Sequence, residues 1–248
     1  MDLGIDDKRA AVAGASSGLG FASAAALVAG GARVAVCGRD RERIDAAAER
    51  LGPSAIAVVA DVGSAEGGRR FVAEAIDRLG GLDILVPNAG GPPPGNFART
   101  DLDAYAAALD LNLLSTVGMC TEAVPVLRAQ GWGRIVAITS ISVRQPIPDL
   151  ILSNTARAGV TGFLKTLALE VAADGITVNS VQPGLHDTDR LKALHGGDPS
   201  ALAAGIPVGV VGRPEDFGAV VAFLCSDAAR FITGAAIPVD GGANRALL

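Results

Sequence analysis

The stretch Gly14-Ala15-Ser16-Ser17-Gly18-Leu19-Gly20 follows a short apolar run at 10–13 and opens an Ala-rich stretch with helical spacing at 20–29. Glycines at this spacing allow a tight turn, a close backbone approach to a pyrophosphate, and close packing of helix on strand. The helix N-terminus adds unpaired N–H groups and a partial positive charge. Without a ligand, the same residues would be a glycine-rich turn. The residues predicted to form a dinucleotide cradle are Gly14, Ser16, Ser17, Gly18, Leu19 and Gly20.

The rest of the chain repeats this alternation of strand and helix. Strands are predicted at 10–13, 33–37, 55–60, 82–86, 134–139, 176–181 and 236–239, and helices at 20–29, 42–51, 69–79, 104–129, 155–172 and 214–225. The strands are apolar on both faces, which is typical of a parallel sheet covered on two sides. We therefore expect an α/β fold, a doubly wound seven-stranded parallel sheet of the Rossmann type, in one domain over 1–248.

Composition excludes several classes of function. Half of the 248 residues are hydrophobic, only 19% are charged and 4% are aromatic, and the net charge is −5. Intrinsic disorder, a nucleic-acid partner and an anionic-membrane partner are thus not expected. Three distant cysteines and two histidines match no disulfide framework or metal site. With an acidic start and no long apolar run, a cytoplasmic protein without a membrane partner is expected.

One connection is unusually long. Residues 185–212 separate the sixth strand from the last helix and include Gly196-Gly197 and Asp198-Pro199. An insertion after the carboxyl end of a strand is placed to act as a lid over a small-molecule substrate, although it could equally be a surface loop with a short helix.

The end of the second strand bears on cofactor choice. An NAD site usually has an acidic residue there, whereas this chain has Gly38 followed by Arg39. A guanidinium can bind a 2′-phosphate through two hydrogen bonds, which favours NADP(H) over NAD(H). Asp40 is near enough to keep NAD(H) open, and Arg39 could be a solvated turn residue.

The chain also contains Asp61-Val62, Asn88-Ala89-Gly90 and a run at 133–140 that ends in Ser140. With the glycine-rich loop, these motifs make the whole chain resemble the short-chain dehydrogenase/reductase family, especially its 3-oxoacyl-carrier-protein-reductase-like branch. The resemblance implies an adenine contact at Asp61-Val62, a cofactor-side loop at Asn88-Ala89-Gly90, and a water-relaying Asn112. It also implies a catalytic Ser140 at the end of the fifth strand. The nicotinamide-side loop would be 183–188, which includes Pro183 and Gly184, and Thr188 would bond the carboxamide. Residues 231–234 and 239–242 match the family's C-terminal strand and its flanks.

One departure from the family changes the expected chemistry. The Tyr-x-x-x-Lys pair falls on Ser153 and Arg157, and the chain's single tyrosine, Tyr105, lies in another helix. The implied catalytic set is therefore Ser140, Ser153, Arg157 and Asn112. Ser is a far weaker acid than a phenol, and a guanidinium does not give up its proton. A lost general acid costs about 10²–10⁴-fold in rate.

Other groups could take over the proton. Ser140, Ser142 or an ordered water could bond the carbonyl, although Ser142 is more simply a turn hydroxyl. His186 or Asp149 could donate a proton, although each is more simply a solvated loop residue. The stiff segment 91–95, Gly-Pro-Pro-Pro-Gly, could narrow the access of a substrate to the pocket, or it could be only a rigid connector.

Three functions follow from these observations. The first is an NADP(H)-dependent oxidoreductase that reduces a ketone or 3-oxoacyl-type carbonyl with a remodelled proton donor. The second is a non-redox enzyme, such as a dehydratase or isomerase. The third is a catalytically silent cofactor-binding subunit. The resemblance also implies a homo-oligomer, a dimer or tetramer, formed through 104–129 and 155–172.

Overall fold

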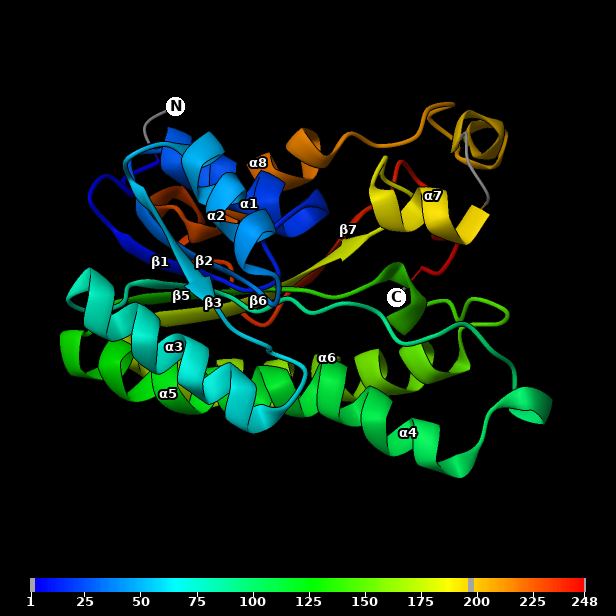
Figure 1. Ribbon diagram of the computed structural model, residues 1–248, viewed down its shortest axis with the longest axis horizontal. Helices are drawn as coiled ribbons and strands as arrows, with labels where there is room; N and C mark the ends of the chain where they lie inside the picture. The colour runs from blue at the N-terminus through cyan, green and yellow to red at the C-terminus, as the bar shows by residue number, and fades with distance from the viewer. Residues whose placement is uncertain (1–2, 196–198, 248) are drawn as a thin grey trace.

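The computed structural model describes residues 3–195 and 199–247, and its centre is one parallel sheet of seven strands in the order β3-β2-β1-β4-β5-β6-β7 (Figure 1). The strands are β1 (Arg9–Val12), β2 (Arg33–Gly38), β3 (Ala55–Val59), β4 (Ile84–Val86), β5 (Gly133–Ile138), β6 (Ile176–Pro183) and β7 (Ala236–Val239). The predicted doubly wound seven-stranded sheet is confirmed.

The order of the strands creates the site. Chain order runs outward from β1 to β3 on one side and from β4 to β7 on the other, so β1 and β4 are neighbours at the switch point, with Val12 opposite Val86. Ligands of open α/β sheets bind outside the carboxyl ends of the strands at such a point. The loops after β1 and β4 begin there.

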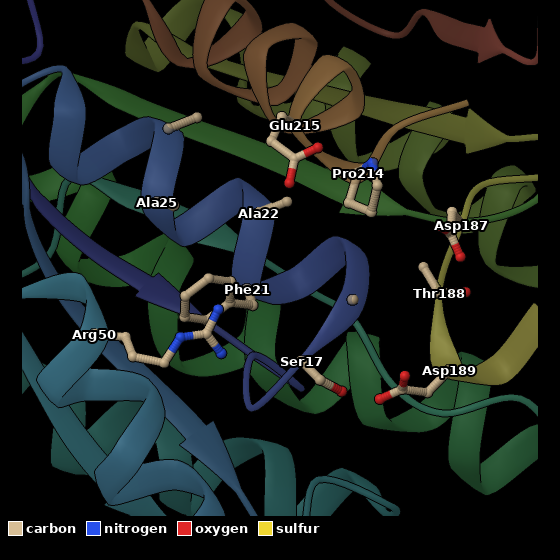
Figure 2. A pocket seen from close by; sticks show the side chains of 12 residues that line it. Ser17, Phe21, Ala22, Ala25, Arg50, Asp187, Thr188, Asp189, Pro214 and Glu215 are labelled. Carbon is tan, nitrogen blue, oxygen red and sulfur yellow. The ribbon is translucent and has the colours of Figure 1, made fainter. Parts of the chain in front are cut away.

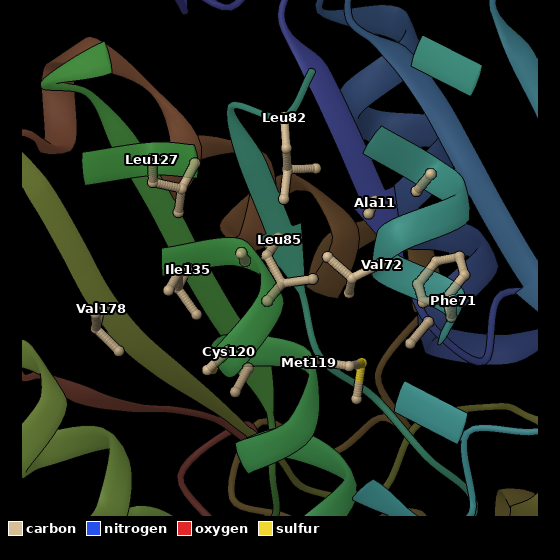
Figure 3. Close-up of a cluster of buried hydrophobic side chains, with 14 of the residues drawn as sticks. Ala11, Phe71, Val72, Leu82, Leu85, Met119, Cys120, Leu127, Ile135 and Val178 are labelled. Atoms are coloured by element: carbon tan, nitrogen blue, oxygen red, sulfur yellow. The ribbon is translucent and has the colours of Figure 1, made fainter. Parts of the chain in front are cut away.

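Helices cover both faces of the sheet (Figure 1). One layer holds α1 (Gly18–Ala29), α2 (Arg41–Leu51) and α8 (Pro214–Cys225); the other holds α3 (Ala65–Leu79), α4 (Leu102–Leu109), α5 (Ser115–Gln130) and α6 (Ile151–Val171). Each layer encloses its own apolar cluster. Figure 3 shows the second, where Phe71, Met119, Leu85 and Ile135 are fully buried between helices and sheet. Burial of this kind is the main stabilising term of the fold.

The helix predicted over 104–129 is interrupted. A π-helical turn, Asp110–Leu114, separates α4 from α5 and contains the buried Asn112. Periodicity does not reveal a single turn of π-helix, because one extra residue barely shifts the apolar pattern. Such turns are frequent at functional sites.

The predicted insertion at 185–212 carries α7 (Asp189–His195) and a 3₁₀ segment, Pro199–Gly205. Figure 1 shows α7 above the carboxyl ends of the central strands. Residues 196–198, with Gly196-Gly197 and Asp198, lie outside the described residues. Across the described ranges, none of the helices combines the length and the hydropathy needed to cross a membrane.

Candidate active site

The loop after β1 and the start of α1 form an open cradle. Gly14 and Gly18 have positive φ angles of 57° and 60°, which favour glycine. Ser17 precedes α1 without making a side-chain cap, and the first turn contains no acidic residue. The helix N-terminus therefore keeps its hydrogen-bond donors and its partial positive charge for an anionic group.

Asn88, after β4, holds this loop in place. Its side-chain amide donates to the carbonyls of Ala13 at 3.2 Å and Gly14 at 3.1 Å. Gly20 completes the packing, because an added Cβ would collide with the Gly14 carbonyl and come within 2.9 Å of Asn88 Nδ2. These contacts join the ends of β1 and β4 to α1 at the switch point.

A cavity of about 330 Å³ extends from this cradle across the ends of β4, β5 and β6. It brings together 14 of the 19 predicted site residues: Gly14, Ser17, Gly18, Leu19, Gly20, Asn88, Ala89, Gly90, Ser140, Ser153, Arg157, Pro183, Gly184 and Thr188. Residues from five separate loops and helices thus border one space, whose remaining lining includes Ile141, Ile147, Leu150, Leu185 and Leu191.

Ser140, Ser153 and Arg157 form the polar wall of the cavity. The Ser140 hydroxyl accepts a hydrogen bond from the Ser142 N–H at 3.1 Å, so its own proton is free to be donated elsewhere. Ser153 lies on the buried side of α6, one helical turn before Arg157. Among the described residues, the Ser153 hydroxyl has no hydrogen-bond partner.

Arg157 is anchored by one end only. Its Nη1 donates to the carbonyls of Ile138 at 3.2 Å and Thr139 at 3.0 Å. Burial, followed by the positive charge of Arg190, lowers the pKa of Arg157 to about 10, so the guanidinium stays charged at neutral pH. Arg157 therefore fixes the end of β5 and brings a positive charge to the cavity wall.

Asn112 lies behind the cavity wall. Its side-chain amide donates to the Gly90 carbonyl at 2.8 Å, and its buried Oδ1 has no partner among the described residues. An acceptor left unpaired at this depth is a position for a bound water. The structure thus places Asn112 next to the cofactor-side loop without placing it on the cavity surface.

The remaining predicted cofactor residues lie outside the cavity. Arg39 is exposed, and the neighbouring Asp40 is occupied as the N-cap of α2, accepting from the Arg43 N–H at 2.9 Å. Asp61 is exposed and accepts from the Gly63 N–H at 2.9 Å, while Val62 is buried. Ser16 is placed against Gly38, where an added Cβ would lie 3.3 Å from the Ser16 Cβ.

The two alternative proton donors differ in position. His186 lines the cavity but is buried edge-on against Phe217, and burial lowers its pKa despite the Gly184 carbonyl at 3.3 Å from Nδ1. A neutral imidazole predominates at pH 7. Asp149 is exposed, accepts a hydrogen bond from Asn96 at 3.1 Å, and is not part of the cavity lining.

Sequence reasoning missed Arg190 in α7. Its Nη1 and Nη2 face the carbonyls of Gly91 at 3.3 Å and Pro92 at 3.4 Å, and it lines the cavity. Partial burial lowers its pKa. No motif marks this residue; only its place in a possible lid, two residues after Thr188, could have suggested it.

A second cavity, of about 400 Å³, lies on the other side of the α1 N-terminus (Figure 2). Ser17, Gly18, Thr188 and Asp189 line both cavities. Figure 2 shows the Asp189 carboxylate pointing toward Ser17. The start of α7 thus separates the two spaces.

Comparison with known proteins matches the chain almost end to end. A family model described as enoyl-(acyl carrier protein) reductase matches residues 14–244. The 3-oxoacyl-[acyl-carrier-protein] reductase of Synechocystis sp. is 38% identical over 239 residues, which are 94% of this chain and 95% of that protein.

Solved structures agree with this match. L-Sorbose reductase from Gluconobacter frateurii, complexed with NADPH and L-sorbose, superposes with a TM-score of 0.93 at 33% identity over 100% of both chains. An NADPH-bound short chain oxidoreductase from Pseudomonas aeruginosa PAO1, described as containing an atypical catalytic center, gives a TM-score of 0.90 at 33% identity, covering 97% of this chain and 99% of that one.

Proposed function

The chain belongs to the short-chain dehydrogenase/reductase family, and we propose that it is an NADP(H)-dependent oxidoreductase that reduces a small-molecule carbonyl with a proton donor other than the family's tyrosine. The observation that carries this proposal is the single cavity in which the glycine cradle, the Asn88 loop and the Ser140–Ser153–Arg157 wall meet. The ketone and 3-oxoacyl carbonyls handled by its relatives are the first substrates to test.

The cofactor cradle fits a dinucleotide. The α1 N-terminus keeps free donors, Gly14 and Gly18 hold the backbone open, and a Cβ at Gly90 would meet nothing within 4 Å. Gly14, Ser17, Gly18, Leu19 and Gly20 would hold the pyrophosphate.

The preference for NADP(H) rests on the end of β2. Gly38 offers no carboxylate to the ribose, and Asp40 is engaged as a helix cap. Arg39 is exposed and available for a 2′-phosphate. The NADPH complexes of the two structural neighbours are consistent with this choice. Ser16 would lie beside the same phosphate, with Asp61 and Val62 at the adenine.

In the bound state, the nicotinamide supplies the reducing equivalent. Pro183, Gly184 and Thr188 would orient it, and Arg157 would contribute positive charge beside it. The Ser140 hydroxyl, whose oxygen already accepts from the Ser142 N–H, would donate to the substrate carbonyl oxygen. Ser153 would provide a second hydroxyl, and Asn112 would hold a water through Oδ1.

The proton must come ultimately from solvent. Reduction of a carbonyl leaves its oxygen one proton short, and neither a serine nor Arg157 can lose a proton permanently at neutral pH. A hydroxyl and water chain can pass a proton inward while Arg157 stabilises negative charge on the oxygen. The atypical center of the Pseudomonas aeruginosa oxidoreductase, which binds NADPH, supports the compatibility of an altered site with cofactor binding.

We place the lid at about 185–212, where α7 and its flanks border the cavity through Leu185, Arg190 and Leu191. These residues would close over the substrate and exclude water. They are the elements of the insertion that would contact substrate first.

The test begins with NADPH fluorescence. Binding at micromolar to low millimolar NADPH, followed by NADPH consumption with a panel of ketones and 3-oxoacyl thioesters, is the expected result. Absence of binding at millimolar NADPH would contradict the proposal.

The double substitution Ser153→Tyr with Arg157→Lys tests the remodelled donor. We expect turnover to rise by about 10²- to 10⁴-fold, the usual contribution of a positioned general acid. The matched control is Ser142→Ala, which removes a buried hydroxyl that is not part of the cavity lining. If the wild type has a measurable turnover rate and the double variant turns over more slowly, the absence of the tyrosine does not limit the reaction.

A further inference from the structure

The cavity has an excess of positive charge. Its ionisable lining consists of Arg157, Arg190, His186 and Asp189. His186 is neutral at pH 7, because burial lowers its pKa. The two guanidiniums remain as cations, against one carboxylate, that of Asp189, which lines both cavities and points toward Ser17 (Figure 2).

Neither arginine is neutralised by a carboxylate. Within the described ranges, the ion pairs of the chain include neither Arg157 nor Arg190. Both donate only to backbone carbonyls: Arg157 through Nη1, and Arg190 to Gly91 and Pro92. Nε and Nη2 of Arg157 therefore keep their protons for a ligand.

Both guanidiniums line the same cavity, so their charges oppose each other. After burial, the charge of Arg190 is the second cause of the lowered pKa of Arg157. Two like charges held together in a partly desolvated space destabilise the free protein. An anion placed between them removes that cost, so the arrangement favours a negatively charged ligand.

The two arginines come from elements other than the phosphate cradle. Arg157 extends from α6 beside Ser140 and Ser153, and Arg190 reaches from α7 to the loop after β4. The pyrophosphate-binding donors are at the α1 N-terminus. The two arginines thus line the same cavity as Ser140 and Ser153, and neither is part of the α1 N-terminus.

We infer that the substrate carries a carboxylate, which Arg157 and Arg190 bind while the Ser140 and Ser153 hydroxyls face its carbonyl. The substrate class is an oxo acid with an apolar chain, suited to the aliphatic part of the lining, Ile141, Ile147, Leu150, Leu185 and Leu191. The inference rests on the proposed function and assigns Arg190 as a specificity-determining residue.

The test compares acids with their uncharged analogues. Pyruvate, acetoacetate and levulinate are each measured beside the corresponding methyl ester, by NADPH consumption and by calorimetric binding to the NADP⁺-saturated protein. We expect at least one acid to bind about 10- to 100-fold more tightly than its ester, since a charge-assisted hydrogen bond contributes this much. Arg190→Gln should remove most of that preference, and Arg190→Lys should restore part of it.

Lys192→Gln is the matched control. It removes a cation from the same helix that pairs with Asp187 and is not part of the cavity lining. Its acid-to-ester ratio should equal that of the wild type.

Three results would overturn the inference. Esters that bind as well as acids exclude a carboxylate site. If Arg190→Gln weakens the binding of acids and esters equally, Arg190 has only a structural role, which is to hold α7 against the loop after β4. A variant that weakens NADPH binding at an unchanged acid-to-ester ratio assigns Arg190 to the cofactor phosphates. If the wild type binds no NADP(H), the proposed function fails, and the same comparison on the free protein still decides this inference.

Discussion

Substitution of Gly20 by alanine tests the connection between helix packing and cofactor binding. The added Cβ would overlap the Gly14 carbonyl oxygen, which belongs to the turn, and would come within 2.9 Å of Asn88 Nδ2. Neither neighbour is the free end of a flexible side chain. The Asn88 amide is held by two hydrogen bonds, at 3.2 Å to the Ala13 carbonyl and 3.1 Å to the Gly14 carbonyl.

The size of the effect follows from what must move. Relief requires α1 to shift away from the end of β1, or the Asn88 bridge to break. Overpacking of this kind costs about 1–3 kcal/mol, and a lost hydrogen bond costs a further ~1 kcal/mol. Because the shift displaces the α1 N-terminus, which would hold the pyrophosphate, we expect NADPH affinity to fall by at least about tenfold.

The assays are NADPH fluorescence titration and thermal unfolding, with Gly162→Ala as the control. Gly162 is exposed within α6, and a Cβ there would meet nothing within 4 Å. Alanine at Gly162 should stabilise the protein by up to ~1 kcal/mol, because alanine has the higher helix propensity, and should leave NADPH binding unchanged. A Gly20→Ala protein with wild-type NADPH affinity and wild-type unfolding would refute the packing argument.

Three further outcomes are expected. Arg39→Ser should weaken NADPH binding by about 10-fold or more and leave NADH binding unchanged, as direct titration of both cofactors can measure, because only NADPH carries the 2′-phosphate. Asp83→Asn should lower the unfolding free energy by about 1–3 kcal/mol at pH 7. Burial opposes ionisation of Asp83, but its hydrogen bonds with Arg9 hold the pKa of the carboxyl below its usual value. The difference in unfolding free energy from the wild type, measured by urea titration, should therefore shrink below about pH 3.8. Burial lowers the pKa of His186, so the unfolded chain takes up the proton first as the pH falls below 6.5. His186→Asn should therefore reduce the loss of Tm between pH 7 and pH 5. A variant whose Tm falls with pH as steeply as that of the wild type would contradict this.

The fold could be read from the sequence because its signals are local and repeated. Each strand is a short apolar run between helical stretches, and burial of both sheet faces leaves few alternatives to a parallel sheet. β7 has the predicted bounds, 236–239, and other strands shift by one or two residues. These shifts occur where hydrogen bonding, and not hydrophobicity, decides the end of a strand.

The parts that escaped prediction depend on contacts between distant segments. The π-helical turn at Asp110–Leu114 is one extra residue in a helical pattern, and its reason is tertiary, since it accompanies the hydrogen bond from Asn112 to Gly90. Arg190 became a site residue only because α7 folds back over the loop after β4. Neither contact leaves a periodic signal in the chain.

The replacements that we propose at the family's tyrosine and lysine positions, Ser153 and Arg157, are best understood together. A lysine ammonium has its three N–H donors on one atom. Arg157 instead donates to the carbonyls of Ile138 and Thr139 through Nη1, and its Nε and Nη2 remain available as donors to a ligand. Because guanidinium is the larger group, it needs space, and a serine at 153 leaves free the volume that a tyrosine ring would fill. Arg157→Lys alone would therefore enlarge the cavity, and Ser153→Tyr alone would crowd the guanidinium. Because the two positions depend on each other, the proposed remodelled donor is tested by the double substitution, which introduces the tyrosine acid and replaces the guanidinium by a smaller group at the same time.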